Sequence, residues 1–566
     1  MPVATEVDLK HDYLTTQIIA YIGNKRSLLS LIRDAVVSLY GTVPAGLKFL
    51  DAFAGSGVVS RLAKFLGCEV YSNDWEYFSY VINRGYVEFQ LSDIDRLFGS
   101  EEALSVLLAE LNRLPDPPEN EQYIARYYAP AHRDIDKADY RTERLFYTRD
   151  NALAIDKIRN RIEMLFPPQD TSPDNRLRHD FLVSLLIYQA ATHTNTSGVF
   201  KACHKGFGGH SGDALTRILA PVHLEIPALI DSVYPCHIFR EDSNQLLASG
   251  RLPVMDIVYL DPPYNQHQYG SNYHMLNTVA LWDKIPAPLT LNSKGVLQEK
   301  AAIRKDWQKT RSSYCYKDSA AAAFRKLLDG IAARHILVSY STDGIIPFNL
   351  MQEICCRKGK VKLFTNEYTK YRGGKQSNSR LNTNVEFILI IDTAGRNTKH
   401  SLGEVNRIIR IRKLLLLFKN KYSRYKLEAN FSIKGNEIIT GLKSSQIAIK
   451  TTALFELHPP ENELAGLSDG DIDILQDKLQ ASLCQTREEE LEEILSRIDG
   501  HPDNDKYFLK WIPYFLKKLA HKKNKEQFYT WCSRIQDLEQ EIPISFSLIK
   551  DKLEQVKALA EMRFQN

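Results

Sequence analysis

The sequence predicts an α/β protein built on a doubly wound, Rossmann-like sheet with a large helical insertion, followed by a mainly helical C-terminal region. Short apolar segments of strand length alternate with amphipathic segments of helix length over residues 1–395. A glycine-rich turn, AGSG at 54–57, joins the first strand to a helix, as in nucleotide-binding sheets. After about residue 395 the sequence becomes polar and then helical, which indicates a separate C-terminal part.

The elements follow in the order that such a sheet requires. Residues 16–40 begin with a turn at Gly23-Asn24 and continue as an amphipathic helix. Residues about 90–200 have helical, aromatic-rich patterns with a proline-rich break at 114–118, and residues 319–333 (SAAAAFRKLLDGIAA) predict another helix. The predicted strands are 48–53, 68–74, 234–242, 254–260, 335–341 and 383–392, with a short β region at 436–457.

Composition narrows the class of protein. Hydrophobic residues make up 44% and charged residues 25%, which is typical of a soluble globular protein. The longest apolar runs are strand-sized, and the N-terminus lacks the layout of a signal peptide, so we expect a cytoplasmic, nucleoid-associated protein without a membrane partner. The eight cysteines have no zinc-binding spacing, so we expect reduced thiols and no metal site.

The first group of candidate site residues is Asp51-Ala52-Phe53-Ala54-Gly55-Ser56-Gly57. A strand ends there, and small residues allow the backbone to approach a ligand closely at the start of the next helix. Asp74 ends the following strand, where a carboxylate can accept hydrogen bonds from ribose hydroxyls. Alone, this turn is weak evidence for a nucleotide site.

The second group is Asp261-Pro262-Pro263-Tyr264, directly after the buried strand MDIVYL. A carboxylate and a proline carbonyl can both accept N–H bonds from the exocyclic amine of a nucleic-acid base. They would hold the nitrogen lone pair toward a methyl sulfonium, while the aromatic ring offers a stacking surface for a base rotated out of its helix. The tetrapeptide therefore predicts methyl transfer to a base amine.

These segments, in this order, resemble the Dam-like, class α N6-adenine-specific DNA methyltransferases over residues about 15–395. The resemblance implies S-adenosylmethionine as cofactor and duplex DNA as substrate. Tyr21-Ile22-Gly23-Asn24-Lys25-Arg26 resembles the N-terminal motif of the cofactor pocket, with Lys25 near the methionine moiety. The segment 51–57 resembles the main cofactor loop, Asp74 the ribose-binding acid, and Asp242 the residue near the cofactor's adenine. The tetrapeptide at 261–264 is similar to the family's catalytic motif.

The resemblance also implies a domain organisation and a biological role. Residues 1–90 and 230–395 would form the methyltransferase domain, 91–229 a helical insertion that is a candidate target-recognition region, and 396–566 a C-terminal accessory region. Such enzymes protect DNA in restriction-modification systems, so a cognate restriction endonuclease is an expected partner. Methylation of RNA adenine or of cytosine N4, and a catalytically silent binding module, remain alternatives, although Asp261 favours adenine over cytosine.

Cations outside these motifs are candidate nucleic-acid contacts. Lys201 and Lys205 lie in the glycine-rich segment 201–212, and Lys370, Arg372 and Lys375 lie in a second glycine-containing segment, 370–375. Residues 406–426 and 515–525 are strongly basic, and they fit either phosphate contacts or solvated helix faces.

Overall fold

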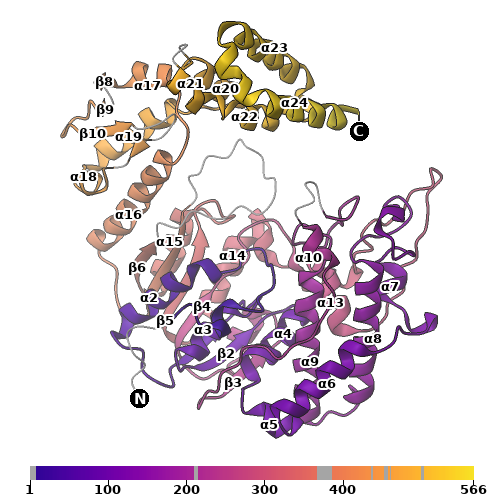
Figure 1. Cartoon of the computed structure of the whole chain (residues 1–566). Helices are drawn as coiled ribbons and strands as arrows, with labels where there is room; N and C mark the ends of the chain where they lie inside the picture. The colour runs from indigo at the N-terminus through magenta and orange to yellow at the C-terminus, as the bar shows by residue number, and fades with distance from the viewer. Residues whose placement is uncertain are drawn as a thin grey trace. The chain divides into compact units, whose positions relative to one another are not determined.

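The computed structural model describes residues 8–208, 214–365, 385–434, 437–451, 457–458, 460–498 and 502–565. The predictions for Lys370, Arg372 and Lys375 lie outside the described residues. The chain divides into two compact units, with the division after Leu402, and each is described separately below (Figure 1).

The first unit is centred on a seven-stranded sheet with the order β3-β2-β1-β4-β5-β7-β6. All neighbouring pairs are parallel except those made by β7, which runs antiparallel to both β5 and β6. The strands are β1 (Lys48–Asp51), β2 (Glu69–Asn73), β3 (Cys236–Phe239), β4 (Met255–Leu260), β5 (Ala333–Ser341), β6 (Lys360–Thr365) and β7 (Glu386–Asp392). This sheet confirms the predicted doubly wound fold.

The central strands are apolar because they are covered on both faces. Phe49 of β1 is in register with Val70 of β2 on one side and Ile257 of β4 on the other, and all three side chains are buried. The strand order reverses direction between β1 and β4, and ligands of such sheets bind beyond the carboxyl ends of the strands at this point.

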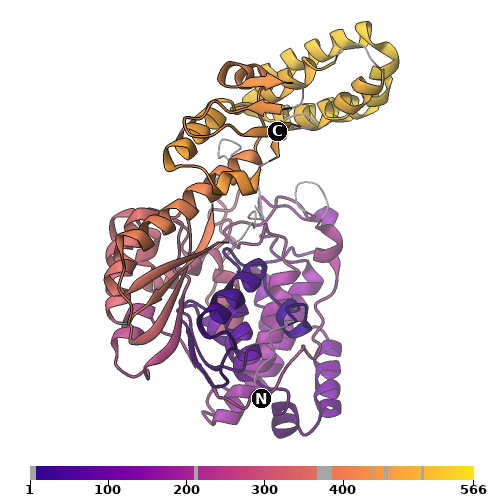
Figure 2. The ribbon, with the colours of Figure 1, turned by 90° about the vertical axis from the view of Figure 1, so that its left-hand side faces the viewer.

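Helices cover both faces of the sheet (Figure 2). Ile388 and Ile390 of β7 share a core with α2 and α3. Phe387 faces the opposite layer, where its ring lies 5.1 Å from that of Phe348 of α15. The helices around the sheet are α1 (Asp12–Thr15), α2 (Leu29–Tyr40), α3 (Val58–Phe65), α4 (Tyr77–Asn83), α11 (Ser243–Ala248), α12 (Tyr269–Asn272), α13 (His274–Leu281), α14 (Lys317–Asp329) and α15 (Phe348–Lys358).

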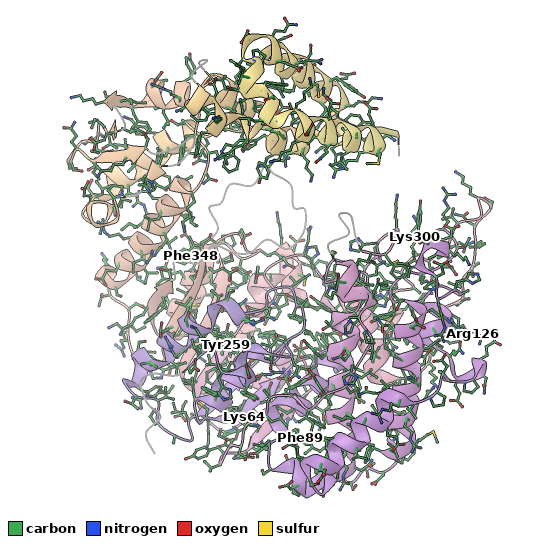
Figure 3. All side chains as sticks on the ribbon, viewed as in Figure 1. Lys64, Phe89, Arg126, Tyr259, Lys300 and Phe348 are labelled. Carbon is green, nitrogen blue, oxygen red and sulfur yellow. The ribbon has the colours of Figure 1, made fainter. Side chains whose placement is uncertain are left out.

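A helical region lies between β2 and β3 in the chain. It comprises α5 (Asp93–Phe98), α6 (Glu101–Arg113), α7 (Ile124–Tyr127), α8 (Arg149–Leu165), α9 (Pro173–Thr192) and α10 (Leu215–Leu219). Its core contains Tyr128, Phe146 and Tyr147, so these aromatic side chains pack inside the protein rather than stacking on bases. Lys64 of α3 donates to the Phe89 carbonyl at 3.1 Å and ties this region to the sheet (Figure 3).

Strand β6 was not among the predicted strands. Its sequence, KVKLFT, begins with lysines that alternate with apolar residues. The alternation suits an edge strand that is only partly covered. Strands β1 and β3 are also shorter than predicted. Strand β1 ends at Asp51 rather than at residue 53, and β3 spans only Cys236–Phe239 of the predicted 234–242.

The second unit is mainly helical, as predicted, and contains two hydrophobic cores. One core surrounds a four-stranded sheet of order β11-β10-β9-β8, which begins at Ser432, slightly before the predicted β region. The strands are β8 (Ser432–Lys434), β9 (Glu437–Ile439), β10 (Ala448–Thr451) and β11 (Leu457–His458). The helices are α16 (Lys399–Phe418), which crosses from the first unit, α17 (Arg424–Asn430), α18 (Glu461–Ala465), α19 (Asp469–Ala481), α20 (Arg487–Leu495), α21 (Pro502–Leu509), α22 (Ile512–Leu519), α23 (Lys525–Glu541) and α24 (Pro543–Gln565). None of the described helices combines the length and the apolar character needed to cross a lipid bilayer.

Candidate active site

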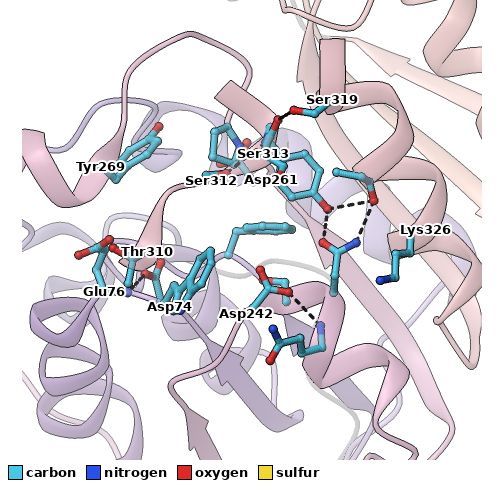
Figure 4. Close-up of a pocket in the computed structure, with 18 of the residues that line it drawn as sticks. Asp74, Glu76, Asp242, Asp261, Tyr269, Thr310, Ser312, Ser313, Ser319 and Lys326 are labelled. Carbon is cyan, nitrogen blue, oxygen red and sulfur yellow. Dashed lines mark hydrogen bonds between the residues drawn. The ribbon is translucent and has the colours of Figure 1, made fainter. Parts of the chain in front are cut away.

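A cavity of about 590 Å³ lies at the edge of the sheet where four strands end (Figure 4). Phe53 follows β1, Asp74 follows β2, Asp242 follows β3 and Asp261 follows β4, and all four side chains line the cavity. Of the other predicted site residues, Tyr21 and Pro263 also line it. Those absent from the lining are Gly23, Lys25, Asp51, Gly55, Ser56, Gly57, Pro262 and Tyr264.

The glycine turn requires glycine for two separate reasons. Gly55 has φ 51°, and a Cβ atom there would lie 2.7 Å from the Tyr21 ring. Gly57 has φ 77° and precedes the first residue of α3, and a Cβ atom there would lie 2.7 Å from Asn83 Oδ1. The turn therefore lies directly against Tyr21 at Gly55 and against Asn83 at Gly57, and a side chain at either position would push the turn away from that neighbour.

Asp74 holds this turn and also faces the cavity. Its Oδ2 accepts the Gly55 backbone N–H at 2.8 Å, and its Oδ1 accepts the N–H of Glu76 at 2.8 Å. Burial raises the pKa of the Asp74 carboxyl, although these backbone hydrogen bonds oppose the shift.

Asp51 lies behind the turn. Ser60 Oγ donates to its Oδ2 at 2.8 Å, and burial raises the pKa of Asp51 to about 7. Ser56 is likewise buried, at 3% exposure. The side chains of these two predicted cofactor residues therefore lie within the protein and do not line the cavity.

Lys25 and Asp261 form an ion pair, with Nζ 2.9 Å from Oδ2. The Lys25 side chain is almost fully buried, whereas Asp261 retains 15% exposure toward the cavity. Lys25 Nζ also donates to the Gly23 carbonyl at 3.0 Å. Burial alone would lower the pKa of Lys25, but the neighbouring negative charge, chiefly that of Asp261, raises it well above its ordinary value.

Tyr264 is packed inside the protein. Its ring is 7% exposed and lies edge-on to Tyr340 at 5.8 Å, with Lys25 Nζ 5.3 Å from its centre. The Tyr264 carbonyl accepts the N–H of Ile345 at 3.0 Å. A base could stack on the face of this ring only after a side-chain movement.

Several cavity residues were missed by the sequence analysis. Burial raises the pKa of Glu76 to about 7, and Asn277 Nδ2 donates to Glu76 Oε2 at 2.6 Å. Tyr314 lies edge-on to Phe53 at 5.6 Å, and its hydroxyl donates to Asn244 Oδ1 at 2.7 Å. Trp75 and Glu76 had a sequence signal, since they directly follow Asp74 in the chain. The other missed lining residues include Trp75, Tyr269, Thr310, Ser312, Ser313, Ser319 and Lys326.

The predicted substrate-binding lysines lie outside the cavity lining. Lys201 and Lys205 are exposed, and Lys205 Nζ lies 5.4 Å from the centre of the Tyr140 ring. The buried Asn195 holds this segment, because its side-chain amide donates to the carbonyls of Leu145 at 3.0 Å and Gly206 at 3.2 Å. Lys201 and Lys205 therefore lie on an exposed loop that is held by the hydrogen bonds of Asn195.

The family model and the relatives that match this chain are all methyltransferases. Residues 21–292 match the family of D12 class N6 adenine-specific DNA methyltransferases. The chain is 30% identical over 377 residues to the type II methyltransferase M.NlaIII of Neisseria lactamica, which covers 66% of this chain and 98% of that protein. It is 29% identical to the type II methyltransferase M.CviAII of Paramecium bursaria Chlorella virus 1, over 62% of this chain and 93% of the relative. It is 28% identical to the type II methyltransferase M.FokI of Planomicrobium okeanokoites, over 65% of this chain and 52% of the relative. The chain belongs to the D12 class N6 adenine-specific DNA methyltransferases.

Proposed function

We propose that this adenine-specific DNA methyltransferase takes its methyl group from S-adenosylmethionine and is the modification enzyme of a restriction-modification system with a cognate endonuclease. The observation that carries the proposal is the Asp261 carboxylate on the cavity wall, held by Lys25 and following the same sheet edge as the glycine turn. The relatives include proteins named Modification methylase LlaI of Lactococcus lactis and StsI of Streptococcus sanguinis, which supports the biological context.

The cavity fits this cofactor in size and in charge. A volume of about 590 Å³ is within the range of sites for molecules of this size. The lining contains four carboxylates, on Asp74, Glu76, Asp242 and Asp261, and one cationic side chain, on Lys326. This balance suits a ligand that carries a sulfonium and an ammonium group, whereas a pyrophosphate would be repelled.

We assign the cofactor contacts by the chemistry of the lining. Asp74 and Glu76 would accept the ribose hydroxyls, and Phe53 and Tyr314 would contact the adenine ring system. Asp242, whose Oδ1 caps α11 by accepting the N–H of Gln245 at 3.0 Å, would lie near the adenine edge. When bound, the cofactor supplies an electrophilic methyl group on a positively charged sulfur.

The protein's contribution to the reaction is to hold a base amine. Asp261 and the Pro262 carbonyl would accept the two N6 hydrogens of a flipped adenine and orient the nitrogen lone pair. Lys25 fixes the Asp261 carboxylate in place, so that its negative charge stabilises the positive charge developing on N6. The proton lost from the methylated amine can leave to water. Tyr264 would meet the base after the ring moves from Tyr340.

We propose that residues 1–90 and 230–395 form the catalytic domain and that the helical region 91–229 contributes to target recognition, since it carries the exposed Lys201 and Lys205. These lysines would contact phosphates, which set the register of a protein on DNA.

The test is transfer of tritium from labelled S-adenosylmethionine to mixed-sequence duplex DNA and, in parallel, to RNA. We expect label in N6-methyladenine from the duplex. Label confined to RNA or to methylcytosine would contradict the proposed substrate, and absence of label despite cofactor binding would favour a silent binding module. Protection of the methylated DNA from a co-encoded endonuclease tests the restriction-modification role.

A further inference from the structure

The second unit carries a row of aromatic and cationic side chains along α21 and α22. Tyr507 lies in α21, Tyr514 and Lys518 lie in α22, and Lys510 and Trp511 lie in the turn between them. Their contacts form a continuous row, because Lys510 Nζ lies 5.8 Å from the centre of the Trp511 ring and the rings of Trp511 and Tyr514 lie 5.9 Å apart. We call these five residues the Tyr–Lys row. Both helices also contact α20, so the row is part of a packed helical core and not of an isolated segment (Figure 1).

The rings of this row support the lysines. Lys510 Nζ lies 4.1 Å from the centre of the Tyr507 ring, and Lys518 Nζ lies 4.4 Å from that of Tyr514. Tyr514 and Tyr507 are nevertheless 52% and 38% exposed. A lysine that rests on an aromatic ring has fewer conformations to lose, so it meets an anion at a lower entropic cost than a free lysine.

The charge around the row is one-sided. Residues 507–525 contain six lysines and no acidic residue, the lysines being Lys510, Lys517, Lys518, Lys522, Lys523 and Lys525. Lys421 approaches from before α17, with Nζ 5.1 Å from the centre of the Phe515 ring. Helix α20, which contacts α21 and α22, is acidic. Two of its glutamates form ion pairs away from the row, Glu489 with Lys426 and Glu492 with Arg534. Glu490 is 3.9 Å from Lys518, a long contact for an ion pair.

The other basic stretch, 406–426, does not have this character. Arg407 and Arg410 pair with acidic residues of α19, and Arg424 pairs with Glu428. These three arginines are paired within the unit, whereas the lysines of 507–525 lie in a segment that contains no acidic residue.

We propose that the Tyr–Lys row, together with Lys517, binds the phosphate backbone of duplex DNA and so forms a second DNA contact outside the methyltransferase unit. Duplex DNA is the polyanion that this family acts on, and in this respect the inference rests on the proposed function. The contact is independent of sequence, because lysines and phosphates carry no base information. It raises the affinity of the enzyme for any DNA and leaves the chemistry at Asp261 unchanged.

The experiment measures binding of the full chain to a mixed-sequence duplex of about 40 base pairs over a series of salt concentrations. The variant neutralises three lysines, Lys510→Gln, Lys517→Gln and Lys518→Gln. The control neutralises three exposed lysines of the same unit, Lys434→Gln, Lys443→Gln and Lys450→Gln, and so has the same net charge. Each phosphate contact contributes about 0.9 to the slope of log affinity against log salt.

We expect the row variant to lower the slope by about 2 to 3 and the affinity at low salt by about tenfold or more, and the control to change the slope by less than about 1. Methyl transfer at saturating DNA should be equal in all three proteins. Equal slopes in the row variant and the wild type would overturn the inference and leave an acidic protein as the partner of this surface.

Two readouts separate this inference from the proposed function. If the wild-type chain transfers no methyl group to DNA but binds it through the row, the proposed function fails and the inference stands. If it methylates DNA and the row variant binds as tightly as wild type, the inference fails and the function stands. Tyr514→Leu adds a check on the support given by the rings, with an expected loss of affinity of about threefold and an unchanged salt slope.

Discussion

Lys25 and Asp261 lie more than two hundred positions apart in the chain, yet their charged groups meet at 2.9 Å at the edge of the central sheet. The pair links the N-terminal motif to the tetrapeptide at 261–264. It also fixes one oxygen of the carboxylate that we propose to hold the target amine.

Replacement of Asp261 by Ala should abolish turnover while leaving cofactor binding largely intact. The carboxylate is proposed to act on the base, and the proposed cofactor contacts come mostly from residues that follow other strands. We expect the rate to fall by at least about a thousandfold, as for loss of a preorganised electrostatic contact. Calorimetric titration with S-adenosylmethionine provides the comparison, and loss of cofactor binding would mean that the roles are wrongly assigned.

Lys25→Met should reduce the rate by about a hundredfold, because Asp261 then loses the cation that positions it. Breaking a nearly buried pair should also destabilise the protein by about 3 kcal/mol. A double-mutant cycle with Asp261→Asn measures the coupling. Additive effects of the two substitutions on stability would show that the pair contributes no interaction of its own.

Gly55→Ala should weaken cofactor binding by about tenfold or more. The residue has φ 51°, and the new Cβ would press on the Tyr21 ring. Gly250→Ala is the matched control, since Gly250 has φ 69° but nothing lies within 4 Å of a Cβ there. We expect that control to lose some stability and to bind the cofactor normally, as measured by calorimetry.

Cofactor binding should strengthen as the pH rises from about 6 to about 8. Burial raises the pKa of Glu76 from its ordinary value to about 7, so the carboxyl is neutral below this pH and negative above it. The negative form attracts a cationic ligand, while in the free protein ionisation at this buried site reduces stability as the pH rises through 7. The thermal stabilisation by cofactor should therefore grow with pH. Glu76→Gln should flatten that dependence, and an unchanged pH profile in this variant would exclude Glu76 as the responsible group.

Arg61→Met should destabilise the protein by about 3 kcal/mol. The guanidinium is 1% exposed and donates to the carbonyls of Tyr13, Thr16 and Gln17 at 3.0 to 3.1 Å. Gln17 has φ 50°, a conformation that Arg61 helps to hold just before the Tyr21 motif. Chemical denaturation gives the free energy of unfolding. Arg61→Lys retains the charge but not the three-carbonyl geometry, so it should recover less than half of the loss.

The parts of the site that were predictable are encoded locally. The turn at 54–57 and the tetrapeptide at 261–264 each follow a buried strand, and the fold brings the ends of such strands to one edge. The Lys25–Asp261 pair was not predictable from the residues, since it depends on tertiary packing. The segment that contributes Ser312, Ser313 and Tyr314 to the cavity wall shows no regular hydrophobic periodicity in the sequence. Tyr264 follows a strand end, but its ring packs against Tyr340 inside the protein.

The lining of the cavity also fixes when the site can exist during synthesis. Its walls come from segments as early as Tyr21 and as late as Lys326. A nascent chain that has emerged only as far as the tetrapeptide at 261–264 lacks the wall that carries Tyr314, although it already contains the glycine turn. The proposed cofactor would therefore contribute its binding energy to folding only after residue 326 has left the ribosome, and the strands β1 to β4 would until then depend on their own packing.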